Sequence, residues 1–319
     1  MTTATYRSNL PQMNGRTLLT DGGIETTLIF HEGFDLPLFA SYVLLDDDTR
    51  GRKALRDYYA RYIDIARDTR SGFVLESPTW RCSRDWGAKL GHDADAIASF
   101  NRKAIALMEE LRRGAEIDEP IVISGNIGPR GDGYAPDTQM TAEEAEAYHR
   151  HQIETFAETG ADMIGAVTMT HTGEAIGIVR AAKAAGIPVA IAFTVETDGR
   201  LPSGQPLGEA IRETDAATGN APAYYMINCA HPDHFRAALE TDAAWLKRVW
   251  GVRANASRLS HAELDEAEEL DAGNPAELGR DYAQLKRVLP NLRVYGGCCG
   301  TDHRHIEAMA DCCFQHQNA

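Results

Sequence analysis

Short apolar runs alternate with amphipathic segments along most of the chain. Eight runs have the composition of buried strands, at residues 17–20, 73–75, 121–124, 163–167, 189–193, 224–227, 250–254 and 293–295. Six longer segments place apolar residues at helical spacing, at residues 51–70, 95–113, 141–159, 173–185, 233–240 and 275–289. Eight strands alternating with helices in 319 residues predict an α/β fold, a single (β/α)8 TIM barrel.

Local signals at the ends of these segments agree with that alternation. Thr141 with Glu144 three residues later has the pattern of a capping box, and Gly160 and Gly186 stand where helices end. A doubly wound sheet would also alternate, but no G-x-G-x-x-G follows the first strand. No linker or repeat interrupts the pattern, so we expect one domain over residues 1–319. The acidic stretch 261–271 is interpreted as a solvated helix face.

Polar residues follow the predicted strands. In a TIM barrel the residue after each strand lies at the rim that carries catalysis. The residues expected at this rim are Asp21, Glu76, Asn126, Thr168, Glu196, Cys229, Asn255, Cys298 and Cys299. Packing does not explain a polar group at every strand exit, so the set indicates a site.

Three of these rim residues are cysteines. Cys298 and Cys299 follow the last strand inside Gly-Gly-Cys-Cys-Gly, and Cys229 follows the sixth strand. Three thiolates would bind zinc and leave its fourth position open, as in a catalytic zinc site. Adjacent side chains diverge in an extended strand, so the flanking glycines are expected to supply a turn. The alternative interpretation is three ordinary buried cysteines.

The other cysteines and the C-terminal histidines are assigned no chemistry. Cys82, Cys312 and Cys313 are interpreted as structural. The histidines that follow the last strand are expected at the surface; they are His303, His305 and His316.

Composition narrows the class of partner. The net charge of −15 argues against nucleic-acid binding, which requires clustered Lys and Arg. The same charge either mildly favours a cationic ligand or serves solubility alone. The N-terminal residues lack the apolar core of a signal peptide, and no apolar stretch approaches the length of a membrane helix. We therefore expect a cytoplasmic protein with reduced thiols and no membrane partner.

Taken together, the motifs resemble those of the homocysteine S-methyltransferase family. This family includes S-methylmethionine-dependent and betaine-dependent enzymes and the homocysteine module of cobalamin-dependent methionine synthase. The matching motifs occur in order across nearly the whole chain: Asp21-Gly22-Gly23, Thr79-Trp80, Gly125-Asn126-Ile127-Gly128-Pro129, Gly160-Ala161-Asp162, Phe193-Thr194-Val195, Gly199-Arg200-Leu201, Asn228-Cys229 and Gly297-Cys298-Cys299-Gly300.

The resemblance implies a barrel that holds Zn2+ through Cys229, Cys298 and Cys299. It further implies transfer of a methyl group from a cationic small molecule, a sulfonium such as S-methylmethionine or a betaine, to a zinc-bound thiol. The expected acceptor is homocysteine, which gives methionine. Three alternatives stay open: a donor that is a corrinoid protein, a different thiol acceptor, or a zinc-binding barrel without catalysis. A homo-oligomer is compatible with all of them.

The same resemblance suggests substrate contacts. In the family, the loop at Asp21 contacts the amino-acid end of homocysteine; here the Gly22 and Gly23 amides would receive a carboxylate and Asp21 an ammonium, unless this Asp-Gly is simply a turn. Trp80, with Phe39 and Tyr42 as further candidates, would face the cationic donor or serve only in packing. The remaining expected substrate contacts are Asn126, Thr168 and Asn228.

The chain departs from the family pattern after the fourth strand. The family has a glutamate there that helps bind the amino group of homocysteine, whereas this chain has Val167 before Thr168. Pro78 also replaces an asparagine at the second strand exit. Glu25 or Glu76 would replace the missing carboxylate, or the acceptor differs from homocysteine.

Overall fold

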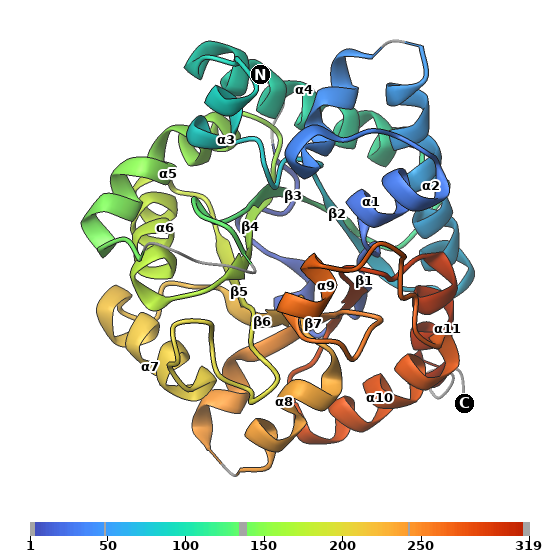
Figure 1. Ribbon diagram of the computed structural model, residues 1–319, viewed down its shortest axis with the longest axis vertical. Helices are drawn as coiled ribbons and strands as arrows, with labels where there is room; N and C mark the ends of the chain where they lie inside the picture. Colours follow the sequence, from blue (N-terminus) through green and yellow to red (C-terminus); the bar gives the residue numbers. More distant parts are fainter. Residues whose placement is uncertain (1–3, 48, 134–138, 242, 315–319) are drawn as a thin grey trace.

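A closed barrel of parallel strands forms the centre of the protein. The computed structural model describes residues 4–47, 49–133, 139–241 and 243–314. Its strands are β1 Leu18–Leu19, β2 Gly72–Glu76, β3 Ile121–Ile127, β4 Met163–Met169, β5 Val189–Phe193, β6 Tyr224–Asn228, β7 Val249–Ala254 and β8 Val294–Gly297. Each strand pairs in parallel with the next, and β8 pairs with β1 to close the ring (Figure 1). All eight predicted strands and the TIM barrel are confirmed.

Helices surround the barrel and follow its strands. They are α1 Ile24–Thr26, α2 Gly51–Asp68, α3 Arg84–Lys89, α4 Ala94–Gly114, α5 Ala142–Ala157, α6 Thr172–Ala185, α7 Leu207–Thr218, α8 Pro232–Leu239, α9 His261–Asp265, α10 Pro275–Val288 and α11 His303–Phe314. Short 3-10 or π segments are η1 Pro11–Asn14, η2 Thr27–His31, η3 Pro37–Phe39, η4 Ser41–Asp46 and η5 Ala244–Arg248. The six predicted helices are present within a few residues of their expected ends.

The capping prediction is confirmed and one helix prediction is wrong. The Glu144 amide donates to Thr141 Oγ1 at 3.2 Å, and the Thr141 amide donates to Glu144 Oε2 at 2.9 Å. Gly186 ends α6 in the left-handed conformation, with φ 68°. The acidic stretch is not one solvated helix: α9 ends at Asp265, and its first residue, His261, is buried.

Helix α7 was not predicted, because its buried face is partly polar. Three of its buried residues are Thr214, Asp215 and Thr218, so the apolar spacing is weak. The Thr214 and Thr218 hydroxyls donate to backbone carbonyls one turn earlier, and Asp215 binds Arg248. The helix therefore buries satisfied polar groups in place of an apolar stripe.

The N-terminal segment packs against the barrel. The amides of Thr5 and Tyr6 both donate to Asp162 Oδ1 at 2.7 Å, just before β4 begins. Gln12 is fully buried and donates to the Tyr224 hydroxyl at the start of β6. These contacts are to residues at strand starts, so this segment covers the end of the barrel opposite the strand exits.

No helix within the described ranges is long and apolar enough to cross a membrane. A single domain over residues 1–319 stays a prediction.

Candidate active site

Three thiols converge where β6 and β8 end. Cys298 Sγ lies 2.9 Å from Cys229 Sγ, which lies 3.6 Å from Cys299 Sγ. All three sulfur atoms are within 4.8 Å of one another, and this is the one potential metal-binding group found among the described residues. Sulfurs bound tetrahedrally to zinc at about 2.3 Å would lie about 3.8 Å apart. The donor set therefore fits zinc, with Cys298 and Cys229 needing to separate slightly.

A tight turn brings the two adjacent cysteines to one side. The Cys298 carbonyl accepts from the Thr301 amide at 3.1 Å and from its hydroxyl at 2.7 Å. Gly300, between them, has φ 77°, a conformation that other residues resist. A side chain on Gly300 would also contact the carbonyl of Asp271 at 2.7 Å.

The glycines before the cysteines have a different role from the one predicted. Neither Gly296 nor Gly297 has a positive φ. A Cβ on Gly296 would lie 2.1 Å from Thr20 Oγ1, and one on Gly297 would lie 2.0 Å from Thr301 Oγ1. These glycines allow close packing next to the cysteines, and Gly300 alone supplies the left-handed turn.

The electrostatics of the cluster favour a thiolate. Hydrogen bonds with the Cys229 and Cys299 thiols lower the pKa of Cys298 well below its usual value, and the positive charge of Arg253 acts in the same direction. The thiolate is the form of cysteine that binds metal. The same hydrogen bonds raise the pKa of Cys229 well above its usual value, so the free cluster favours one thiolate, on Cys298.

A buried histidine holds the strained backbone of Cys229. Cys229 has φ 56°, which is unusual for a residue with a side chain. His261 Nε2 lies 2.7 Å from the Cys229 carbonyl oxygen, and its Nδ1 lies 3.1 Å from Glu196 Oε1. Helix α9, which begins at His261, therefore acts as a support for one of the three cysteines. His261 was not predicted as a site residue, because it stands in a stretch interpreted as solvated.

Asn228 connects two predicted site residues. Its Oδ1 accepts from the Thr168 amide at 2.8 Å, and its Nδ2 donates to Thr168 Oγ1 at 2.9 Å. The same Nδ2 lies 3.9 Å from Cys298 Sγ. Thr168 has φ 63°, so this paired contact stabilises a second strained position at the rim.

An arginine that sequence analysis missed lies between two acidic residues of the site. Arg253 Nη2 donates to Asp21 Oδ1 at 2.7 Å, Nε donates to the Gly297 carbonyl at 3.1 Å, and Nη1 lies 3.7 Å from Glu76 Oε1. Tyr58 donates to the other Asp21 oxygen at 3.0 Å. Both oxygens of Asp21 are thus engaged within the protein. An arginine inside an otherwise apolar barrel strand was the signal that would have found it.

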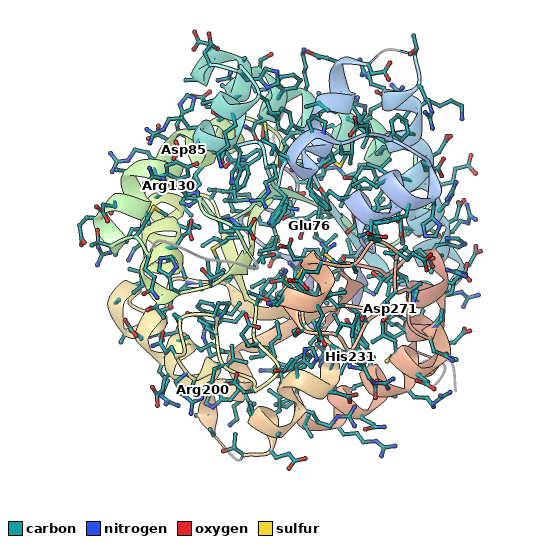
Figure 2. The ribbon with its side chains drawn as sticks, viewed as in Figure 1. Glu76, Asp85, Arg130, Arg200, His231 and Asp271 are labelled. Carbon is teal, nitrogen blue, oxygen red and sulfur yellow. The ribbon has the colours of Figure 1, made fainter. Side chains whose placement is uncertain are left out.

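Two carboxyl groups of the site have strongly raised pKa values. Burial raises the pKa of Glu76 to about 7 despite the opposing effect of Arg253. Burial likewise raises the pKa of Glu25 to about 7, and its carboxylate accepts from the Ser41 hydroxyl at 2.9 Å. Glu76 lies near the centre of the barrel in Figure 2. Perturbed groups of this kind are typical of functional sites.

Other predicted contacts are placed as follows. The Gly23 amide donates to the Thr301 carbonyl at 3.0 Å, and the Gly22 carbonyl accepts from Tyr58. Asn126 Oδ1 is buried without a hydrogen-bond partner among the described residues. The Gly23 amide is thus already used, whereas Asn126 keeps an acceptor available for a ligand.

The three aromatic candidates differ. The Trp80 ring has the guanidinium of Arg81 4.1 Å from its centroid, so one cation already lies over it. Phe39 is 49% exposed. Tyr42 is fully buried, its ring packs edge-on against Phe100 and its hydroxyl lies 2.9 Å from His92 Nδ1, and these contacts favour the packing interpretation.

The other cysteines do not belong to the thiol cluster. Cys82 and Cys313 are buried and Cys312 is exposed. The surface prediction is wrong for His305, which is fully buried and bonds the Ala272 carbonyl at 2.8 Å. His316 lies outside the described residues.

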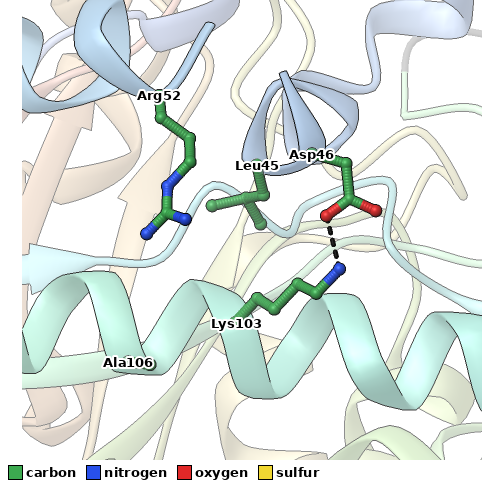
Figure 3. Close-up of a pocket in the computed structure, with 5 residues that line it drawn as sticks. All are labelled: Leu45, Asp46, Arg52, Lys103 and Ala106. Carbon is green, nitrogen blue, oxygen red and sulfur yellow. Dashed lines mark hydrogen bonds and ion pairs between the residues drawn. The ribbon is translucent and has the colours of Figure 1, made fainter. Parts of the chain in front are cut away.

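One surface pocket lies outside the barrel. It has a volume of about 460 Å3 and is lined by Leu45, Asp46, Arg52, Lys103 and Ala106, next to α2 and α4 (Figure 3). Lys103 is paired with Asp46. This pocket contains no thiol, and its lysine amine is paired with a carboxylate, so the thiol cluster at the strand exits is the candidate active site.

Comparisons with known proteins agree with the fold. The family model described as Homocysteine S-methyltransferase matches residues 18–313. Homocysteine S-methyltransferase of Escherichia coli is 25% identical, covering 92% of this chain and 94% of that protein. Selenocysteine Se-methyltransferase of Brassica oleracea is 22% identical, covering 92% of this chain and 88% of that protein.

Solved structures show the same fold. The homocysteine methyltransferase MmuM from Escherichia coli in its metallated form superposes with a TM-score of 0.70 at 18% identity, covering 95% of this chain and 98% of that one. Its oxidized form gives a TM-score of 0.71 at 19% identity, covering 92% and 95%. The match of the family model over most of the chain, on a barrel that gathers three cysteines at its strand exits, shows that the chain belongs to the homocysteine S-methyltransferase family of enzymes.

Proposed function

We propose that this enzyme transfers a methyl group from a cationic small molecule to homocysteine and that the reaction depends on zinc. The convergence of three cysteine sulfurs within 4.8 Å at the catalytic end of a barrel carries this proposal. The names of the Escherichia coli and maize relatives support homocysteine as the acceptor.

The residues of the cluster suit thiol activation. Cys229, Cys298 and Cys299 would hold zinc, which when bound supplies a position where an acceptor thiol loses its proton. Three thiolates around a divalent ion leave an excess of negative charge, which keeps a fourth sulfur electron-rich and nucleophilic. Arg253, beside Cys298, offsets part of that charge in the free protein.

The surroundings suit a cationic donor. Glu25 comes from α1, and its charge is close enough to that of Cys298 for each to influence the other. S-Methylmethionine, a sulfonium, would be attracted by this negative potential. Holding the donor methyl in line with the acceptor sulfur would supply the orientation that the reaction needs.

The decisive experiment pairs homocysteine with several donors in the presence of zinc-loaded protein. S-Methylmethionine, S-adenosylmethionine and glycine betaine would be tested in turn, and methionine would be measured. We expect methionine with a sulfonium donor and one bound zinc per chain. Cys298→Ser should lose both zinc and turnover, whereas Cys312→Ser, at an exposed cysteine, should retain both.

The alternatives have distinct outcomes. Bound zinc without methionine from any donor would contradict the proposed reaction. Methylation of another thiol but not of homocysteine would show that Val167 accompanies a changed acceptor.

A further inference from the structure

Two oppositely charged groups at the base of the site are incompletely paired. Arg253 Nη1 and Glu76 Oε1 lie 3.7 Å apart, beyond hydrogen-bond distance. Neither Arg253 Nη1 nor Glu76 Oε2 meets the geometry of a hydrogen bond with any described residue, although both atoms are buried and the Ser124 hydroxyl is close enough to the Glu76 carboxyl to oppose its raised pKa. Buried polar atoms without partners are costly, so this pair indicates a position that a polar ligand completes.

Each residue is held in place by other contacts. Arg253 is anchored by Asp21 at 2.7 Å and by the Gly297 carbonyl at 3.1 Å, which leaves Nη1 as its unused group. The glutamate carboxylate lies against Gly165 of β4, where an added Cβ would be 2.9 and 3.0 Å from its two oxygens. The absence of a side chain at Gly165 therefore makes room for this carboxylate inside the barrel.

We propose that Glu76 and Arg253 together bind the zwitterionic head group of the amino-acid acceptor, with the ammonium at Glu76 and the carboxylate at Arg253. This inference rests on the proposed function and names the groups that select its acceptor. An α-amino acid carries both charges on one carbon, which matches two opposite charges this close. Arg253 bonds the residue next to Cys298, so a head group here places the acceptor sulfur beside the thiol cluster.

The position of the Glu76 carboxylate explains why residue 167 is a valine and not a glutamate. Gly165 and Val167 are two residues apart on β4, so both face the barrel interior, and Val167 belongs to the interior apolar cluster. A glutamate at position 167 would place another carboxylate close to Glu76 and Asp21, with one arginine to offset all three. Like charges in a buried site repel strongly, so the valine is consistent with a carboxylate supplied from β2.

Glu76 is favoured over the other two acidic residues of the site. Asp21 has both oxygens engaged by Arg253 and Tyr58. Glu25 is only partly buried and already accepts from Ser41. Glu76 is the one of the three that combines full burial with an oxygen lacking a partner in the described residues.

The test measures binding of three thiols to zinc-loaded protein by calorimetry. The thiols are homocysteine, 4-mercaptobutanoate, which lacks the ammonium, and 3-aminopropanethiol, which lacks the carboxylate. We expect the wild-type protein to bind homocysteine about 10- to 100-fold more tightly than either analogue, the scale of one charge-assisted hydrogen bond.

Variants test whether Glu76 causes the preference for homocysteine over the thiol that lacks an ammonium. Glu76→Gln should bind homocysteine and 4-mercaptobutanoate equally while retaining one zinc per chain. Gly165→Ala displaces the carboxylate without changing charge and should reduce the preference for homocysteine over 4-mercaptobutanoate. Glu25→Gln should preserve this preference. The carboxylate-free thiol tests whether the carboxylate is recognised. Arg253→Lys, which keeps a positive charge facing Asp21 but loses the guanidinium fork, tests whether Arg253 recognises it, and unchanged discrimination against 3-aminopropanethiol in this variant would contradict that assignment.

Each outcome decides the inference. Equal binding of homocysteine and 4-mercaptobutanoate by the wild type overturns it, as does discrimination that survives Glu76→Gln or is lost in Glu25→Gln instead. Discrimination without methyl transfer from any donor supports the head-group site and rejects the proposed reaction. Zinc-loaded protein that binds none of the thiols rejects both.

Discussion

At the scale of single residues, the site is distinguished by carboxyl groups buried close to one another. Asp21, Glu25 and Glu76 all lie near the strand exits, and burial raises the pKa of each of them. Arg253 compensates only part of their combined charge. A site of this kind stores unfavourable energy in the free protein, which a bound cation relieves.

Glu76 should make folding stability depend on pH in a defined direction. Its pKa is raised from 4.5 to about 7, so between these pH values the folded protein holds a proton that the unfolded chain has released. The contribution of this proton to the free energy of unfolding is therefore fully present below pH 4.5 and is lost as the pH rises to about 7. Replacing Glu76 by Gln should remove this loss, which amounts to about 3 kcal/mol.

Urea denaturation of zinc-free protein at several pH values would measure this effect. The difference in unfolding free energy between Glu76→Gln and wild type should shift in favour of the variant as pH rises from 4.5 to 7, then level off. Glu25→Gln should behave similarly, because burial also raises the pKa of Glu25 to about 7. Curves that remain parallel across this range would show that Glu76 titrates normally.

The sequence predicted these residues unevenly. The cysteines were identified because adjacent thiols at a strand exit, flanked by glycines, have few explanations other than a metal. Arg253 and Gly165 were missed because their roles depend on contacts across the barrel, with Asp21 and Glu76, which lie far from them in the chain. Local patterns locate strand exits, but they do not show which side chains meet between them.

At the scale of elements, the segment between β7 and α10 contributes to the site. It contains α9, whose His261 contacts Cys229, and Asp271, whose backbone packs against Gly300. Figure 1 shows α9 inside the ring formed by the outer helices. Its apolar spacing is weak, so its contacts with the backbone of Cys229 and Gly300 could not be predicted from the sequence.

His261 should affect zinc binding without touching zinc. Its bond of 2.7 Å to the Cys229 carbonyl holds a residue at φ 56°, so His261→Ala should let that backbone relax and move the thiol. Loss of supporting contacts to metal ligands typically lowers affinity about 10- to 100-fold. Competition with a chromophoric zinc chelator would measure the change.

His234→Ala provides a matched control. His234 also bonds a backbone carbonyl of this segment, that of Arg258 at 2.9 Å, and within the described residues it forms no hydrogen bond with a cysteine. We expect this variant to bind zinc like the wild type. Equal zinc affinity in His261→Ala and His234→Ala would show that the histidine only stabilises the segment.

At the scale of the whole molecule, the two ends of the barrel have different roles. Contacts at the strand starts stabilise the fold, and the thiol cluster lies at the strand exits. The order of its strands and helices was predicted from the alternation of short apolar runs and helical segments. In a closed parallel barrel each strand pairs with the next strand along the chain, so this alternation also gives the topology. The contacts of the N-terminal segment could not be predicted from these patterns, because they join residues about 150 positions apart.

Asp162 accepts several hydrogen bonds at the end of the barrel opposite the strand exits. Its two oxygens accept from the amides of Thr5, Tyr6 and Ile123 and from Arg112 Nη1 at 2.7 Å. Asp162→Asn replaces one acceptor oxygen with a donor and removes the charge that Arg112 faces. We expect it to lower the unfolding free energy by about 3 kcal/mol, because it breaks a buried charged network.

The same substitution should leave the thiol cluster intact, since Asp162 lies at the start of β4 and the cysteines lie beyond the ends of β6 and β8. Urea unfolding and zinc content, measured on one preparation, would test both halves of this prediction. Glu119→Gln, which alters an exposed ion pair with Arg16, should change stability by less than about 1 kcal/mol. If Asp162→Asn lost zinc while remaining folded, the two ends of the barrel would be coupled, and the division between a structural end and a catalytic end would not hold for this protein.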